Sequence, residues 1–204
     1  VIDQWNVKGA FGFSSKNCLY ISDDYNRNGK KEIYVFSIKS DSIFLNVIED
    51  IENPALKITN RFIDITGPGI KSPDPFIIPA KMDDLNKDGK GELIFGIGSG
   101  FSQYPRRVYA YYIDQDSLIK SPDASFFIIN ILQADINYDG INEIMPYGYA
   151  SCNINPGKAK YHDNSSWLIV LNKDLNFLFE PIEFKGRYSN TIPILSVNGN
   201  DTLR

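Results

Sequence analysis

The side chains best suited to chemistry are carboxylates and amides that recur in three copies of one motif, at the same positions in each copy. Each copy follows the pattern Asp-x-Asn-x-(Asp/Asn)-Gly-x-x-Glu, with oxygen-bearing side chains at positions 1, 3, 5 and 9. The copies span residues 24–32, 84–92 and 135–143. Alternating side chains of a tight loop can point to one centre, and glycine at position 6 permits the sharp turn. Oxygen donors without His or Cys suit calcium, so the pattern predicts calcium loops rather than zinc or copper sites.

Two other calcium motifs begin with the same residues. An EF-hand needs an acid at position 12 and a helix on each side, and a dockerin-type loop also needs that acid and a following helix. Position 12 is Val35, Phe95 and Pro146 in the three copies. Both alternatives therefore fail in every copy, and a last ligand at position 9, at the start of a strand, fits a β-hairpin.

Apolar runs rich in Ile, Val, Phe and Tyr surround each loop and predict strands. The runs before and after the loops are 19–21 and 33–36, then 76–78 and 93–97, then 126–132 and 144–147. Two further strand-like runs follow in each period, at 43–47 and 56–58, at 108–113 and 117–119, and at 167–171 and 177–179. Each period is thus expected to form four strands, with the oxygen-rich loop between the first and second.

Four short strands in every period of about 40–60 residues are typical of a propeller blade. The expected fold is all-β: a β-propeller of four-stranded antiparallel blades, with about three full blades and partial ones at the ends. Residues 1–204 would form a single propeller, or a fragment of a larger one. The repeats are expected at approximately 16–60, 76–120 and 126–180, with a partial repeat at 192–204.

At the level of these repeats the sequence resembles the FG-GAP/VCBS repeat family, which includes the integrin α-subunit propeller. The Phe-Gly element of that family survives only as Phe11-Gly12 and Phe95-Gly96. In the family the aligned loop binds calcium, so the resemblance implies two or three Ca²⁺ ions. The implied ligands are Asp24, Asn26, Asn28, Glu32 and the Lys30 carbonyl; Asp84, Asn86, Asp88, Glu92 and the Lys90 carbonyl; and Asp135, Asn137, Asp139, Glu143 and the Ile141 carbonyl.

The alternative to a calcium loop is a polar Asx turn that binds no ion. Three copies in phase favour calcium, because a turn does not require an acid at position 9. The copies also differ in charge. Asn28 replaces the acid at position 5 of the first copy, which leaves it two carboxylates against three in each of the others. Since ligand charge tunes calcium affinity, the first loop is expected to bind most weakly.

Composition narrows the class of protein. The chain has 204 residues, a net charge of -4 and no basic patch, which argues against a nucleic-acid partner. It contains no run of about 18 apolar residues, so no transmembrane segment is expected.

The only histidine, His162, is interpreted as a loop or surface residue, because acid–base catalysis needs positioned partners. Cys18 and Cys152 fit either two separate buried thiols or one disulfide.

These observations favour a non-enzymatic, calcium-stabilised recognition or scaffold domain, such as the ectodomain of a bacterial surface or sensor protein. Sites of modest affinity suit millimolar calcium, which predicts an extracellular or periplasmic location at the cell surface. A protein or glycan ligand is expected on the face opposite the calcium loops, where the connections at 39–42, 98–107 and 151–166 lengthen and carry aromatic and basic residues. The alternative is a carbohydrate-binding or polysaccharide-degrading module. The acids available for a glycosidase pair are Asp41, Asp64, Asp74, Asp114 and Asp123.

Overall fold

The computed structural model of the chain describes residues 20–49, 57–66, 76–79, 82–99, 104–124, 126–153, 160–187, 189–194, 197–198 and 202–203. These residues form strands, turns and extended connections, and none of them is helical. The predicted all-β class is therefore confirmed. No helix that is long and apolar enough to cross a membrane occurs in this part of the chain.

The first two repeats form complete four-stranded antiparallel sheets. The first sheet contains β1 (Tyr20–Asp23), β2 (Glu32–Lys39), β3 (Ser42–Glu49) and β4 (Lys57–Ile65) in that order. The second contains β5 (Phe76–Pro79), β6 (Leu93–Gly98), β7 (Arg106–Tyr112) and β8 (Ser117–Lys120) in the same order. In each sheet the oxygen-rich loop joins the first and second strands, as predicted. The fourth strand of the first sheet is longer than the predicted run at 56–58.

The third repeat begins in the same way and then departs from the pattern. β9 (Phe127–Ala134) and β10 (Glu143–Tyr149) pair around the third loop, and β13 (Asn190–Thr191) joins the other edge of β10. β11 (Ser165–Leu168) pairs instead with β12 (Ile182–Lys185). The predicted strands at 167–171 and 177–179 are therefore wrong as continuous strands. Trp167 and Leu168 belong to β11, and beyond them only Leu171 forms bridges, to Ile144 on one side and Phe177 on the other.

A side-chain-stabilised turn explains this departure. The Oδ1 atom of Asn172 accepts hydrogen bonds from the amides of Asp174 and Asn176, both at 3.0 Å, and Leu175 has a positive φ of 57°. Asn side chains that bond nearby backbone groups compete with a strand ladder. The chain therefore reverses between Leu171 and Phe177 before either flanking segment extends into a full strand. A last small hairpin, β14 (Val197–Asn198) and β15 (Thr202–Leu203), falls within the predicted partial repeat at 192–204.

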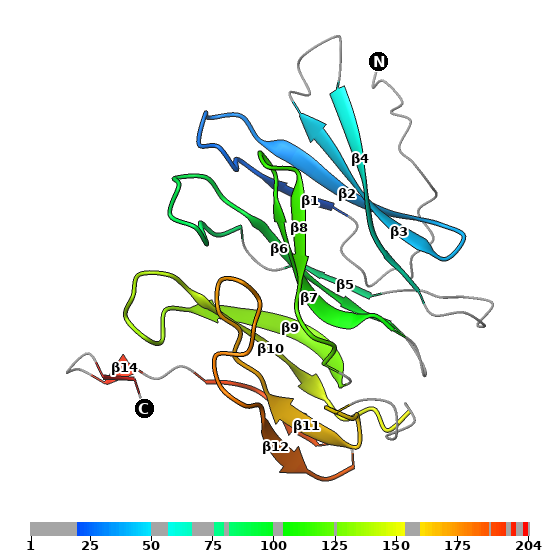
Figure 1. Cartoon of the computed structure of the whole chain (residues 1–204), viewed down its shortest axis with the longest axis vertical. Coiled ribbons are helices and arrows are strands. Elements are labelled where there is room, and N and C mark those ends of the chain that lie inside the picture. The colour runs from blue at the N-terminus through cyan, green and yellow to red at the C-terminus, as the bar shows by residue number, and fades with distance from the viewer. Residues whose placement is uncertain are drawn as a thin grey trace.

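The first sheet, the second sheet and the β13–β10–β9 sheet of the third repeat stack face to face in chain order (Figure 1). The middle sheet is buried on both faces, and every residue of β6 is buried. Alternate residues of β6 pack on opposite faces of the sheet, because successive side chains of a strand point to opposite faces. Leu93, Phe95 and Ile97 join the apolar cluster shared with the first sheet, whereas Ile94 joins the cluster shared with the third repeat.

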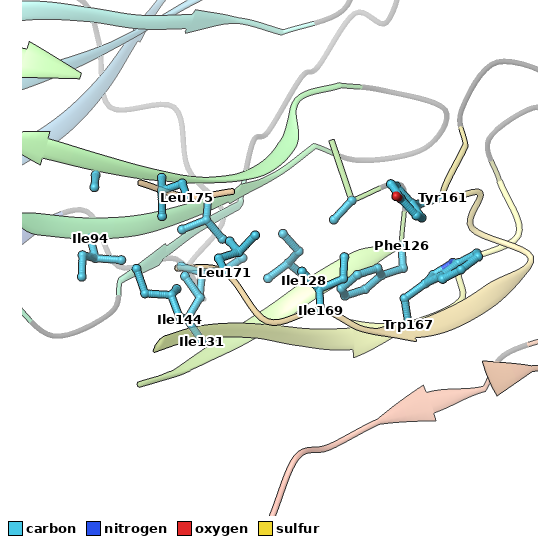
Figure 2. Packing of buried hydrophobic residues seen from close by; sticks show 14 of the residues in the cluster. Ile94, Phe126, Ile128, Ile131, Ile144, Tyr161, Trp167, Ile169, Leu171 and Leu175 are labelled. Carbon is cyan, nitrogen blue, oxygen red and sulfur yellow. The ribbon is translucent and has the colours of Figure 1, made fainter. Parts of the chain in front are cut away.

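Side chains from distant segments fill the space between the second and third sheets. Figure 2 shows Ile94 from β6 beside Ile131 and Ile144 of the third repeat, with Trp167 and Tyr161 at the far end of the same cluster. Gly96 permits this close approach, since a Cβ there would lie 3.3 Å from the Cδ1 atoms of Ile131 and Ile78. The apolar runs that predicted strands therefore also form the inter-sheet core.

Candidate metal loops

Each oxygen-rich loop is closed by side chains that accept hydrogen bonds from its own backbone. In loop 2 (residues 84–92), Asp84 accepts from the amides of Asp88 through Oδ1 at 3.0 Å and Gly89 through Oδ2 at 2.9 Å. Asn86 Oδ1 accepts from the Asp88 amide at 3.0 Å. Asp88 Oδ1 accepts from the Lys90 amide at 2.8 Å. The side chains at positions 1, 3 and 5 thus direct oxygen atoms into the same turn.

Loop 1 (residues 24–32) and loop 3 (residues 135–143) repeat this pattern position by position. The amides at positions 5 and 6 donate to the position-1 carboxylate at 3.0 and 2.7 Å in loop 1, and at 3.2 and 2.8 Å in loop 3. The amide at position 7 donates to the position-5 side chain at 2.7 and 2.8 Å. All three predicted ligand sets therefore lie in loops of one geometry.

Two positions in each loop have left-handed backbone conformations. Gly29, Gly89 and Gly140 at position 6 have φ values of 87°, 88° and 82°, as expected for glycine in a sharp turn. Arg27, Lys87 and Tyr138 at position 4 have φ values of 56°, 60° and 63°. The sequence pattern did not predict the second feature, because residue type at position 4 is variable.

The glutamate at position 9 lies inside its loop. Glu32, Glu92 and Glu143 are only 4%, 1% and 3% exposed. Each carboxylate accepts a hydrogen bond from the amide at position 2, at 3.3, 2.7 and 2.9 Å respectively. Glu32 and Glu143 are the first residues of β2 and β10, and Glu92 bridges Asp83. The strand register therefore fixes where this carboxylate enters the loop.

Burial makes the ionised form of these glutamates costly. Desolvation raises the pKa of Glu92 from 4.5 to about 7, and the charges of Asp88, Asp84 and Asp114 act in the same direction, although the Leu85 amide opposes them. Desolvation also raises the pKa of Glu32, with smaller contributions from Asp24 and Glu49. Loops 1 and 2 therefore hold buried negative charge that a bound cation would stabilise.

The oxygen donors fit calcium in type, and the carboxylates alone do not complete a site. In the part of the chain that the structure describes, no three His, Cys, Asp or Glu side chains form a group that could hold a metal ion. A cation would also need the Asn amide oxygens and the position-7 carbonyl, which are ligands that calcium accepts. The same internal hydrogen bonds are compatible with plain Asx turns. Calcium binding accordingly stays a prediction.

The three loops lie along one edge of the stacked sheets and contact one another (Figure 1). The Gly91 amide of loop 2 donates to the Tyr25 carbonyl of loop 1 at 2.7 Å. The Nδ2 atom of Asn142 in loop 3 donates to Asp83 Oδ2, beside loop 2, also at 2.7 Å. Lys87 Nζ donates to the Asp139 carbonyl of loop 3. Position 8 of each later loop thus contacts the preceding loop or the residue before it.

The connections at the ends of the sheets opposite the loops were expected to form an exposed interaction surface, but several of their residues are buried. Arg106 is fully buried: its guanidinium donates to the Ser99 carbonyl at 3.2 Å, to Ser151 Oγ at 2.9 Å and to Asn153 Oδ1 at 2.7 Å. It also forms a 3.4 Å ion pair with Asp163, which is likewise fully buried. No local sequence pattern predicted this pair, because its members lie 57 residues apart.

Other residues of these opposite connections are also internal or paired. Tyr161 is 7% exposed and packs against Trp167, and Arg107 is paired with Asp123. His162 is partly exposed, with its Nε2 atom 3.8 Å from Glu183 Oε1, in agreement with a loop residue. Cys152 is a half-buried free thiol. Phe101, Lys158 and Cys18 lie outside the described residues.

Comparisons with known proteins identified no relative. No protein-family model, no curated protein and no solved structure matches the chain. The resemblance to FG-GAP/VCBS repeats therefore depends on the loop pattern and its spacing, and it remains a prediction.

The raised pKa of Glu92 predicts the pH dependence of the metal-free protein. A folded-state pKa of about 7 against 4.5 when unfolded means that the folded state binds more protons between these values. The contribution of Glu92 to stability is fully present below pH 4.5 and is lost as the pH rises through 7. In EDTA at pH 8, Glu92→Gln is expected to raise the free energy of unfolding by roughly 1–3 kcal/mol.

Urea unfolding at pH 5 and pH 8 in EDTA measures this effect. The matched control is Glu180→Gln, which changes an exposed carboxylate at the surface of the third repeat, where it is paired with the exposed Lys160. The control should follow the wild type at both pH values. An equal pH response in the wild type and in Glu92→Gln would contradict the prediction.

Proposed function

We propose that this chain is a non-enzymatic, calcium-stabilised recognition and scaffold domain. The observation that carries the proposal is the repetition of one loop geometry three times, each time with a buried position-9 glutamate that a plain turn does not need. The residues that would hold the ions are the side chains at positions 1, 3, 5 and 9 and the carbonyl at position 7. A bound ion would neutralise the clustered carboxylates and join the two strands of each hairpin.

The proposed role of the ions is structural. A cation that binds only the folded state stabilises it by mass action. The contacts between neighbouring loops would extend that stabilisation along the whole edge of the sheets. Modest affinity would suffice where calcium is millimolar, so an extracellular or periplasmic location at the cell surface is part of the proposal.

The stacking of the sheets supports a propeller as the wider architecture. Two complete four-stranded antiparallel sheets and a third, altered repeat pack face to face in chain order, as consecutive blades do. We propose that they are blades of a β-propeller, with the calcium loops on one of its faces. Small-angle scattering on the intact protein would test for the compact disc that a closed ring requires.

A polysaccharide-degrading enzyme is the less favoured candidate. Three of the acids considered for a glycosidase pair have separate partners: Asp64 with Lys120 and Tyr109, Asp114 with Lys90, and Asp123 with Arg107. A glycosidase needs two carboxyl groups facing one another across a cleft. Asp74 lies outside the described residues. The dispersed ion pairs favour a structural role for these acids, so the proposal remains non-enzymatic.

Calcium titration tests the proposed function directly. Adding Ca²⁺ to EDTA-stripped protein is expected to give saturable binding of two or three ions by calorimetry, together with a rise in Tm. At [Ca²⁺] about 100 times Kd, each site that binds only the folded state adds about 2.7 kcal/mol. Magnesium at the same concentration is the control, because it requires near-ideal octahedral geometry. Absence of both binding and a Tm shift would show that the loops are Asx turns.

The ranking of the three loops by calcium affinity is a second test. Asp84→Asn and Asp135→Asn each remove one of three carboxylates, and Asp24→Asn removes one of two. We expect loop 1 to have the weakest site, so Asp24→Asn should abolish only the lowest-affinity step of the isotherm. Loss of the tightest step in Asp24→Asn would reverse the order.

A further inference from the structure

A polar pocket adjoins loop 1 on the face that carries the loops. It has a volume of about 350 Å³ and is lined by Tyr25, Asn26, Asn28, Lys30, Glu32 and Glu49. Five of these residues belong to loop 1, and Glu49 is the last residue of β3. The volume is within the range of small-molecule sites, although the lining is far more polar than is usual for a drug-like ligand.

Loop 1 presents its amides differently from the other two loops. In loops 2 and 3 the Nδ2 atoms of Asn86 and Asn137 donate to the position-5 carboxylate, at 3.0 and 3.1 Å. Position 5 of loop 1 is Asn28, so Asn26 has no such carboxylate to bond. Within the described residues, no hydrogen bond uses the Nδ2 atom of Asn26 or Asn28. Their Oδ1 atoms accept from the loop backbone at 3.1 and 2.7 Å, which leaves the amino groups for the pocket.

The lining combines donors, acceptors and one aromatic ring. The amide groups and the Lys30 ammonium donate hydrogen bonds, and the carboxylates of Glu32 and Glu49 accept them. A hydroxyl group both donates and accepts, so a ligand bearing several hydroxyls can satisfy both kinds of group. The two carboxylates disfavour an anionic ligand, and Tyr25, which also lines the pocket, brings an aromatic side chain of the kind that packs against apolar surface.

The site extends beyond this pocket. A second pocket of about 190 Å³ shares Glu49 and continues over β4 and the β7–β8 turn, where Thr59, Arg61 and Tyr111 line it. Arg61 and Lys57 are already paired with Asp116 and Glu49, which balances charge along this wall. Two adjoining polar pockets suit an elongated neutral ligand better than a single small one.

We propose that this groove on the loop face binds a neutral oligosaccharide, with Asn26, Asn28 and Glu49 as hydrogen-bonding residues and Tyr25 as the ring contact. The inference deepens the proposed recognition function by naming a ligand class, and it places that ligand beside the loops rather than on the opposite face. Asn26 and Asn28 are predicted calcium ligands through their Oδ1 atoms, so the saccharide would use their amino groups, together with Glu49 and Tyr25, which are not predicted ligands.

The test begins with a glycan array of neutral gluco-, galacto-, manno- and N-acetylglucosamine oligosaccharides, probed with the intact chain in calcium and in EDTA. The affinity of the strongest binder is then measured by calorimetry for the wild type, Glu49→Ala and Asn28→Asp, which removes the Nδ2 donor and keeps the oxygen that accepts from the Lys30 amide. Each variant is expected to bind about tenfold more weakly, the loss that follows removal of one hydrogen bond to a charged or polar partner. Glu180→Ala is the control, and its affinity should be unchanged.

The outcomes separate this inference from the calcium proposal. Glu49→Ala should keep the wild-type calcium isotherm while losing saccharide affinity, and this pair of results supports a saccharide site independent of the metal ligands. If saccharide binding weakens in both variants and the protein binds no calcium, the saccharide site is supported and only the calcium proposal is rejected. If no saccharide on the array binds, or if both variants bind as the wild type does, the proposed groove is overturned.

Discussion

Replacing Asp163 by alanine is expected to lower the free energy of unfolding by about 3–5 kcal/mol, because it leaves the buried Arg106 guanidinium without its counter-charge. Both side chains are fully buried, and Asp163 Oδ2 also accepts from Ser151 Oγ at 2.9 Å and from the Asn153 amide at 2.8 Å. Burial lowers the pKa of Arg106, and the charge of Asp163 opposes that shift. The pair joins the start of β7 to the connection between β10 and β11.

Urea unfolding of the wild type, Asp163→Ala and the double variant Arg106→Met/Asp163→Ala measures the effect. The double variant should be more stable than Asp163→Ala, because it removes the uncompensated charge. Asp123→Ala is the matched control: it breaks the neighbouring Arg107–Asp123 pair, which is partly exposed, and should cost about 0–1 kcal/mol. Equal losses in Asp163→Ala and Asp123→Ala would show that burial of the first pair has no energetic consequence.

Truncation of Phe95 to alanine is the second change with a large expected effect. The ring is fully buried between the first and second sheets, with its centroid 4.9 Å from that of Phe36 and 5.1 Å from that of Tyr109. Phe95 and Tyr109 are stacked with only 7° between their planes. Loss of the ring removes apolar burial and opens a cavity, so we expect the free energy of unfolding to fall by about 3–5 kcal/mol.

The result is measured by urea unfolding, with Phe184→Ala as the control. Phe184 is an aromatic strand residue of the same type, but 46% exposed, and its truncation should change stability by no more than about 0.5 kcal/mol. Truncation of a buried phenylalanine normally costs more than this, so a loss below about 1 kcal/mol for Phe95→Ala would contradict the stacking of the first two sheets.

Local sequence was sufficient wherever one short pattern determines the structure. Asp at position 1, Asn at position 3, Gly at position 6 and Glu at position 9 predicted three loops of one geometry, because these residues form hydrogen bonds and turns within nine residues. The apolar runs rich in Ile, Val, Phe and Tyr predicted β2, β3, β6 and β7 for the same reason, since strand propensity is carried by neighbouring residues. The all-β class follows from these elements together.

Predictions failed where two distant segments compete for one partner. The run at 167–171 is as apolar as its counterparts, yet β11 pairs with β12, and the turn built by Asn172 leaves Leu171 with only single bridges. Conversely, Arg106 and Tyr161 were expected on a binding surface because loops usually carry polar and aromatic contacts. Both are buried, because Arg106 bonds Ser151 and Asn153 of the distant 151–166 connection and Tyr161 packs against Trp167 and Phe177.

The sequence by itself determined the loops, the strand–loop–strand hairpins and the oxygen-only donor set, since each is encoded by neighbouring residues. Tertiary structure alone decided the rest. It buried the position-9 glutamates, which raises the pKa of Glu92, and it brought the three loops to one edge. It also paired Arg106 with Asp163 and placed Glu49 beside loop 1. Burial and long-range pairing depend on how whole sheets stack, and no window of nine residues contains that information.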